Sequence, residues 1–343
     1  MDYGDNRADL VLEGGGVKGI ALVGALSELE QAGYRFERVA GTSAGAVAGA
    51  LVAAGMSTTQ LQRVMYGLDY RRFCDKGTLD RIPLVGQGLS LLFERGVFNG
   101  DELREWLGNL LADRGVETFA DLAIDDPGTS LAEDQQFRLV VMATDVTLGR
   151  LVRLPWDYRE VYGLDPRQQR VVDAVRASMS IPFFFEPVSI TNPETGRRST
   201  LVDGGVLSNF PIDTFDRTDL KPPRWPTFGV KLLPALPADT RLLPLAGLRF
   251  SIPLLPPVQL LESVITTAMV GHDQTYLDQP WVAARTIRVD TKPVGVVEFD
   301  LSAERAQLLY DNGREAAKQF LADWKWEDYL AQYRPEPAAV GSS

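Results

Sequence analysis

Two glycines flank a serine near the start of the chain in a pattern that suits a nucleophile. The segment Gly41-Thr42-Ser43-Ala44-Gly45 follows a short strand-like run and precedes a run with helical spacing. In a G-x-S-x-G turn between a strand and a helix the serine backbone is strained, and glycines are needed because neighbouring Cβ atoms would crowd the turn. The pattern predicts that the Ser43 hydroxyl is exposed above a sheet, at a helix N-terminus.

A serine nucleophile needs a base, and histidine is the usual one. The only histidine is His272, and the order Ser43, Asp203, His272 would match an α/β-hydrolase triad. In that fold, however, the serine turn follows several strands, whereas here it follows the second predicted strand. His272 also lies at the end of an apparent helix over residues 260–276, not in a loop at a strand end. We therefore expect a carboxylate as the base.

Two aspartates at predicted strand ends compete for this role. Asp203 ends a strand over 199–202 and is followed by Gly204 and Gly205, which let the backbone approach a ligand closely. Asp145 ends another apolar run but lacks the glycines. An aspartate held dry and close to a serine can accept its proton during attack. We expect Asp203 to be the general base and Asp145 to be the main competitor.

The second glycine-rich segment, Gly14-Gly15-Gly16-Val17-Lys18-Gly19, lies between a strand-like and a helical run. It satisfies the dinucleotide pattern G-x-G-x-x-G. In a dinucleotide-binding fold, however, the next strand ends in an acidic residue, and residues 39–43 include none. The alternative is an oxyanion hole made by the N–H groups of Gly14, Gly15 and Gly16, with Lys18 as a nearby cation. Adjacent parallel strands would bring both loops to one edge of a sheet.

The elements that must position these residues follow an α/β pattern. A strand at 10–13, a helix at 17–31, a strand at 34–40 and a helix at 44–54 predict a parallel pair joined by a right-handed crossover. Further strands are expected at 137–144, 150–154, 199–202, 227–233 and 283–289, and further helices at 58–65, 103–111, 171–179 and 302–321. Asn99 and Glu102 resemble a capping box for the helix at 103–111.

Composition limits the classes of partner. At 343 residues and 45% hydrophobic content, the chain can form one compact domain with insertions. A net charge of −11 without a long basic run argues against nucleic acid. Cys74 is the only cysteine, which excludes an intrachain disulfide and a multi-cysteine metal site. Residues 1–9 lack signal-peptide features, and the uncharged stretch 39–62 is too rich in small residues to predict a transmembrane helix, so we expect a cytoplasmic location.

Together these motifs resemble the patatin-like phospholipase family, which is related in fold to the cytosolic phospholipase A2 catalytic domain. The resemblance rests on both glycine-rich segments, on Asp203-Gly204-Gly205 followed by Asn209-Phe210-Pro211, and on blocks at 143–145 and 177–187. It implies a three-layer fold with a mostly parallel central sheet and a Ser43–Asp203 dyad that needs no cofactor and no metal. The family often has arginine at the position of Lys18, so bidentate phosphate binding is not implied.

The implied activity is hydrolysis of fatty-acyl esters in membrane-derived lipids through an acyl-enzyme, as in a phospholipase A or lysophospholipase. Lipid substrate, transient contact with a membrane or micelle surface and an unknown activating protein are the expected partners. Two alternatives stay open: a non-catalytic lipid-binding protein with this fold, and a dinucleotide-binding oxidoreductase.

The expected organisation is an N-terminal tail (1–7), a catalytic core (8–215), a part that completes the same domain (216–330) and a disordered tail (331–343). Within it, the irregular stretch 68–97 is a candidate flap. The Leu- and Pro-rich segment 234–257 either packs as a loop over the core or touches lipid, and residues 84–93 are a second candidate for lipid contact.

Overall fold

The computed structural model describes residues 6–67, 100–182, 184–219, 221–233, 279–292, 294 and 301–334. Three features expected from the sequence lie outside these residues. They are the candidate flap at 68–97, the Leu- and Pro-rich segment at 234–257, and the helix at 260–276 with His272.

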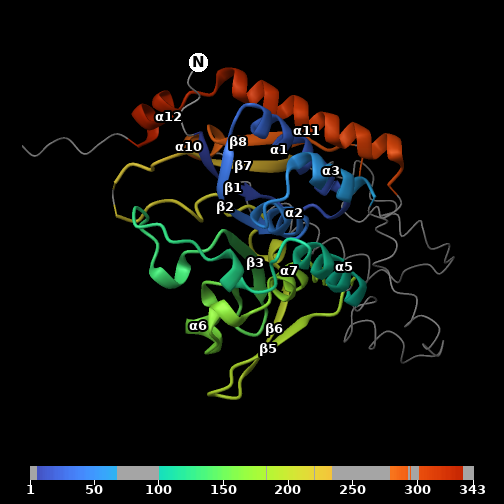
Figure 1. Cartoon of the computed structure of the whole chain (residues 1–343), viewed down its shortest axis with the longest axis vertical. Helices are drawn as coiled ribbons and strands as arrows, with labels where there is room; N and C mark the ends of the chain where they lie inside the picture. Colours follow the sequence, from blue (N-terminus) through green and yellow to red (C-terminus); the bar gives the residue numbers. More distant parts are fainter. Residues whose placement is uncertain are drawn as a thin grey trace, which may run out of the picture.

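One mixed sheet organises the described chain, in the order β5-β6-β3-β2-β1-β7-β8, with β4 paired to β3 off this path (Figure 1). The strands are β1 (Arg7–Leu12), β2 (Arg35–Thr42), β3 (Leu139–Asp145), β4 (Arg150–Leu154), β5 (Val188–Thr191), β6 (Arg198–Asp203), β7 (Thr227–Leu233) and β8 (Thr286–Asp290). Parallel pairing joins β1 to β2 and β7, β2 to β3, and β7 to β8. Antiparallel pairing joins β3 to β4 and β6, and β5 to β6. The predicted α/β class and the parallel pair at its start are confirmed.

Helices surround this sheet. They are α1 (Gly19–Gln31), α2 (Ala44–Ala53), α3 (Thr58–Tyr66), α5 (Asp101–Ala112), α6 (Asp157–Tyr162), α7 (Val171–Ser178), α10 (Pro280–Ala283), α11 (Ala303–Asp323) and α12 (Trp326–Tyr333). Short 3-10 turns occur at η1 (Gly16–Lys18), η4 (Phe119–Leu122), η5 (Glu133–Gln135), η6 (Pro166–Gln168) and η7 (Gly204–Val206). In Figure 1, α11 lies along the end of the sheet formed by β7 and β8.

Two helix ends differ from expectation. The helix expected at 103–111 begins earlier, at Asp101, and the residue before it is Gly100, in a left-handed conformation with φ of 74°; Asn99 of the predicted capping box lies outside the described residues. A Cβ at Gly100 would lie 2.2 Å from Nε of Arg176, so the close approach of this guanidinium also favours glycine. At the other end of the chain, α12 continues to Tyr333, past the start of the predicted tail, where Tyr329 contacts the rings of Trp324 and Tyr333.

Strands β1, β3 and β7 are buried on both faces, as their apolar runs indicate. On β1, Leu10 and Leu12 belong to the large core that includes residues of α1, α2, α7 and α11, while Val11 points to the other face. A smaller core covers that face, where strand side chains pack against Phe210, Ile212, Phe215 and Val282. Among the described helices, none has the length and apolar content needed to cross a membrane.

Candidate active site

The carboxyl ends of β2 and β6 meet along one edge of β3. Since β4 occupies the opposite edge of β3 here, β2 and β6 must share the remaining one. On that edge β2 pairs Thr42 with Met142, and β6 pairs Asp203 with the next residue, Ala143. Because β2 is parallel and β6 antiparallel to β3, both strands reach this point with their last residues. Ser43, which follows Thr42, is therefore brought beside Asp203.

Ser43 occupies a strained turn between β2 and α2, as predicted, but it is 1% exposed, so the prediction of an exposed hydroxyl is wrong. Its backbone angles are φ 53° and ψ −123°, and no other non-glycine residue in the described ranges has a positive φ. Close backbone packing makes the flanking glycines necessary. A Cβ on Gly41 would lie 2.3 Å from the carbonyl oxygen of Gly45, and a Cβ on Gly45 would lie 2.3 Å from that of Leu12. The first turn of α2 is thus pressed against the end of β1.

The loop after β1 faces the same turn. A Cβ built on Gly14 would lie 3.0 Å from Cβ of Ser43 and 2.3 Å from Oδ1 of Asn209, so this position has room only for glycine. Asn209 also donates a hydrogen bond of 3.0 Å to the Gly14 carbonyl oxygen. In the part of the chain that the structure describes, neither Gly14 nor Gly15 donates its N–H to a protein acceptor. Gly16 follows with φ of 56°. The two glycine-rich segments therefore lie together.

Lys18 lies beside this loop but is itself buried. Burial lowers the pKa of Lys18 to about 8, while the carboxylates of Glu13 and Asp290 oppose that shift. These carboxylates favour the protonated form of Lys18, and their negative charges offset part of its field at the loop. Gly19 starts α1, where an added Cβ would lie 3.3 Å from Cβ of Ala44. Gly19 thus permits close packing between α1 and α2.

Asp203 is fully buried at the end of β6. One carboxylate oxygen, Oδ1, accepts a hydrogen bond of 2.8 Å from the N–H of Gly205. A Cβ on Gly204 would lie 2.6 Å from the carbonyl oxygen of Met142, so this glycine allows the turn after β6 to approach β3. Burial raises the pKa of Asp203 to about 7, although the Ser43 hydroxyl and the Gly205 N–H lower it in part. A carboxylate with this pKa can take up a proton near neutral pH.

The Ser43 hydroxyl and the second oxygen of Asp203 are not hydrogen-bonded to each other in this structure. The hydroxyl is close enough to lower the pKa of Asp203, yet it donates to Sδ of Met179, 3.6 Å away. Oδ2 of Asp203 accepts no hydrogen bond from any described residue. Catalytic hydrogen bonds are often long before substrate binds, so this geometry is compatible with proton transfer once the hydroxyl turns.

The competing aspartate, Asp145, has a different environment. Its Oδ1 accepts hydrogen bonds from the N–H groups of Thr147 and Leu148, at 2.9 and 3.0 Å, in the turn between β3 and β4. Its Oδ2 accepts one from the hydroxyl of Tyr162 at 3.0 Å. Both oxygens of Asp145 are therefore committed to the hairpin and to α6. Of the two aspartates, Asp203 has the unbonded oxygen.

Comparison with known proteins decides the family. Residues 10–216 match the description "Patatin-like phospholipase", a stretch that covers more than half of the chain. The chain belongs to the patatin-like phospholipase family. The solved structure of VipD from Legionella pneumophila has the same fold, with a TM-score of 0.52 at 18% identity over 92% of this chain and 67% of that chain.

Members of the patatin-like family with similar sequences occur in bacteria and mammals. The uncharacterized protein YqhO of Bacillus subtilis (strain 168) is 34% identical over 319 residues, which cover 93% of this chain and 99% of that protein. Patatin-like phospholipase domain-containing protein 7 of Rattus norvegicus is 29% identical over 209 residues, or 61% of this chain and 12% of that protein. The chain thus spans nearly all of the first relative and a small part of the second.

The patatin-like assignment favours the oxyanion interpretation of Gly14, Gly15 and Gly16 over the dinucleotide one. Strand β2 ends at Thr42 and is followed by Ser43, so it lacks the terminal acidic residue that a ribose-binding strand would carry. Nothing in the described chain supports the oxidoreductase alternative.

Two residues of this patatin-like site were not predicted to contact the nucleophile. Ser178 accepts a hydrogen bond of 2.8 Å from the N–H of Ser43, and Met179 accepts one from its hydroxyl. In the sequence, both residues stood out only as members of the family block at 177–187, where α7 ends. No periodicity or spacing indicates a contact across 135 positions, and the signal available was a serine at the end of a buried helix.

Proposed function

We propose that this protein is a serine acyl hydrolase that cleaves fatty-acyl esters of lipids with Ser43 as the nucleophile and Asp203 as the general base. The observation that carries the proposal is the end-to-end meeting of β2 and β6 on β3, which brings the strained serine beside a buried aspartate. Family membership supports lipid ester hydrolysis in general terms. The residue roles are inferred from the geometry, and the lipid substrate is inferred from the family.

In the first step, the Ser43 oxygen attacks the ester carbonyl carbon while Oδ2 of Asp203 takes the hydroxyl proton. The carbonyl oxygen becomes an oxyanion, which the N–H groups of Gly14, Gly15 and Gly16 stabilise. One oxyanion donor is worth about 3 kcal/mol of barrier. When the tetrahedral intermediate collapses, the bond to the leaving alcohol breaks, and Asp203 returns the proton to that alcohol. The product is an ester of Ser43 with the fatty acid.

In the second step, water replaces the alcohol. The water oxygen attacks the acyl-enzyme carbonyl carbon while Asp203 accepts a proton from the water. The same N–H groups stabilise the second oxyanion. Collapse releases the fatty acid and returns the proton to Ser43. A single base therefore serves both steps, and the sequence of events needs no histidine.

The direct test is hydrolysis of a chromogenic fatty-acyl ester together with labelling by a fluorophosphonate probe. Wild-type protein should release the chromophore and bind the probe covalently at Ser43, while Ser43→Ala should do neither. A matched control is Ser27→Ala, because Ser27 is a buried serine on α1 whose hydroxyl donates to the Gly24 carbonyl oxygen within the same helix. Wild-type hydrolysis by Ser43→Ala would rule out the proposal, and lipid binding without labelling or turnover would favour the non-catalytic alternative.

The lipid class needs a separate experiment. Incubation of wild-type protein and Ser43→Ala with a mixed lipid extract, followed by mass spectrometry, should reveal which phospholipid, lysophospholipid or glyceride loses a chain.

Contact of residues 234–257 with lipid, a cytoplasmic location and an activating protein stay predictions from the sequence. Deuterium exchange with and without liposomes tests the first, and unchanged exchange in that segment would reject it.

A further inference from the structure

We infer that Ser178 is a positioning residue for the nucleophile: its hydroxyl holds the backbone N–H of Ser43 and so fixes the direction in which the Ser43 hydroxyl leaves the turn. The inference rests on the proposed role of Ser43. Ser178 lies at the end of α7 and does not touch the reacting atoms. It acts through the backbone of Ser43.

The N–H of Ser43 would have no backbone acceptor without Ser178. The ladder between β2 and β3 ends at Thr42, so the strand no longer supplies a partner. Ser43 is also the residue before α2, where N–H groups lack acceptors within the helix. Ser178 fills this gap with a hydrogen bond of 2.8 Å from a side chain that is fully buried. A buried N–H without a partner is costly, so the bond is a strong restraint.

The bond acts on a backbone conformation that needs restraint. Residues in sparsely populated φ and ψ regions persist only where their surroundings over-determine them. The carbonyl side of Ser43 is fixed by helix α2, because its oxygen accepts hydrogen bonds from Ala46 at 2.8 Å and Val47 at 3.2 Å. The N–H side is fixed by Ser178. With both peptide groups held, the φ of 53° is maintained and the side chain is aimed in one direction.

The same short segment also holds the base. The carbonyl oxygen of Ser180 accepts the N–H of Asp203 at 2.9 Å. The Ser180 hydroxyl is in turn bonded to Arg176, accepting from Nη1 at 2.6 Å and donating to the carbonyl oxygen at 3.0 Å. The segment from Ser178 to Ser180 thus contacts the backbones of both Ser43 and Asp203. Removing the Ser178 hydroxyl would release the nucleophile while leaving the contact to the base in place.

The test is Ser178→Ala, compared with the wild type and with Ser27→Ala. A misplacement of about 1 Å costs up to about 100-fold in rate, so we expect kcat on a chromogenic acyl ester to fall about 10- to 100-fold. KM should be unchanged, because the substrate contacts remain, and the midpoint of the pH profile should not move, because Asp203 is untouched. Ser178→Thr, which keeps the hydroxyl, should recover most of the lost rate, and Ser27→Ala should match the wild type.

A second measurement does not depend on turnover. Amide hydrogen exchange in wild-type protein should show the Ser43 N–H protected, and Ser178→Ala should lose that protection at Ser43 while keeping it at Asp203. An unprotected Ser43 N–H in wild type would overturn the inference even if Ser178→Ala did not fold. Wild-type kcat in a folded Ser178→Ala would overturn it as well. Failure of the proposed function would give a different result from failure of this inference, because Ser43→Ala would then keep its hydrolytic activity.

Discussion

Two buried aspartates at opposite ends of the sheet show what distinguishes a reactive carboxylate from a structural one. Asp9 lies near the start of β1 and is 1% exposed, while Asp203 ends β6 and is 0% exposed. Burial raises the pKa of both. Asp9, however, accepts a forked pair of hydrogen bonds from Arg38, with 2.9 Å between Nε and Oδ1. Among the described residues, the Asp203 carboxylate accepts one hydrogen bond, from the Gly205 N–H, and Oδ2 accepts none. The Arg38 guanidinium therefore pairs with Asp9, whereas Asp203 is able to exchange a proton.

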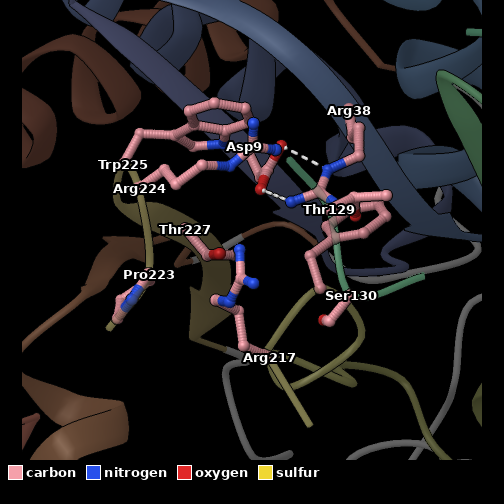
Figure 2. A pocket seen from close by; sticks show the side chains of 10 residues that line it. Asp9, Arg38, Thr129, Ser130, Arg217, Pro223, Arg224, Trp225 and Thr227 are labelled. Atoms are coloured by element: carbon pink, nitrogen blue, oxygen red, sulfur yellow. Dashed lines mark hydrogen bonds and ion pairs between the residues drawn. The ribbon is translucent and has the colours of Figure 1, made fainter. Parts of the chain in front are cut away.

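The surroundings of Asp9 extend this contrast (Figure 2). It lines a cavity of about 20 Å³ with three arginines, of which Arg224 pairs with Asp126 and Arg217 with Asp219. Space of this size holds about one water molecule. Each arginine that lines this cavity thus has its own aspartate, and the cluster fastens the amino ends of the strands. Burial alone therefore does not identify the base; Asp203 differs from Asp9 in having no cationic partner among the described residues.

The largest effect should come from Asp203→Asn, which keeps the size of the side chain but removes the proton acceptor. General-base catalysis contributes about 10²- to 10⁴-fold, so we expect kcat to fall about 1000-fold. Ester hydrolysis under saturating substrate measures it. A variant that kept more than a tenth of the wild-type rate would show that another group serves as the base, and Asp145→Asn would then be the next variant to measure.

The same substitution at Asp9 should act on stability instead. Asp9→Asn leaves the buried Arg38 without its counter-charge, and breaking such a pair costs about 3 kcal/mol. Urea unfolding should show this loss. The fraction that remains folded should hydrolyse ester at the wild-type rate, since Asp9 lies at the far end of the sheet. Unchanged stability, or a rate lost in folded protein, would break the contrast between the two ends.

The pH dependence of stability should be next in size. The pKa of Asp203 is about 7 in the folded protein and lower when unfolded, so between these values the folded state binds the extra proton. Stability from this group is therefore lost as the pH rises toward 7. From pH 5 to pH 8, wild type should lose about 2–3 kcal/mol relative to Asp203→Asn. Parallel unfolding curves for both proteins measure the difference, and a constant difference would mean that Asp203 titrates normally.

The smallest effect concerns the third aspartate. Tyr162→Phe removes one hydrogen bond to Asp145, which should cost about 1 kcal/mol of unfolding free energy. We expect kcat to be unchanged, because Asp145 serves the hairpin between β3 and β4. Thermal unfolding and ester hydrolysis on the same sample check both outcomes. A large fall in kcat without a loss of stability would assign Asp145 a part in the chemistry.

Local features of the fold could be predicted from the sequence. The strand at Thr227–Leu233 matches the prediction residue for residue, and the helix expected at 58–65 is α3, Thr58–Tyr66. Both rest on short-range signals, an apolar strand-like run and helical spacing. The glycine spacing likewise predicted the turn at Ser43, because its cause is crowding among residues close in sequence.

The relation between distant elements could not be predicted in the same way. The pairing of Ala143 with Asp203 depends on β6 running antiparallel on an edge that β2 has just left, and no periodicity encodes that register. For this reason the sequence left Asp145 and Asp203 in competition. The hydrogen bond from Ser43 to Ser178 is invisible for the same reason, since it joins a turn to the end of a helix far along the chain.

The most direct test of the account is the rate at which a fluorophosphonate probe labels Ser43, measured in wild type, Asp203→Asn and Asp9→Asn at pH 8, with peptide mapping of the labelled site. The account predicts that Asp203→Asn labels far more slowly than wild type, and that folded Asp9→Asn labels at the wild-type rate. Equal labelling of wild type and Asp203→Asn would contradict it, because the buried carboxylate would then not activate the serine.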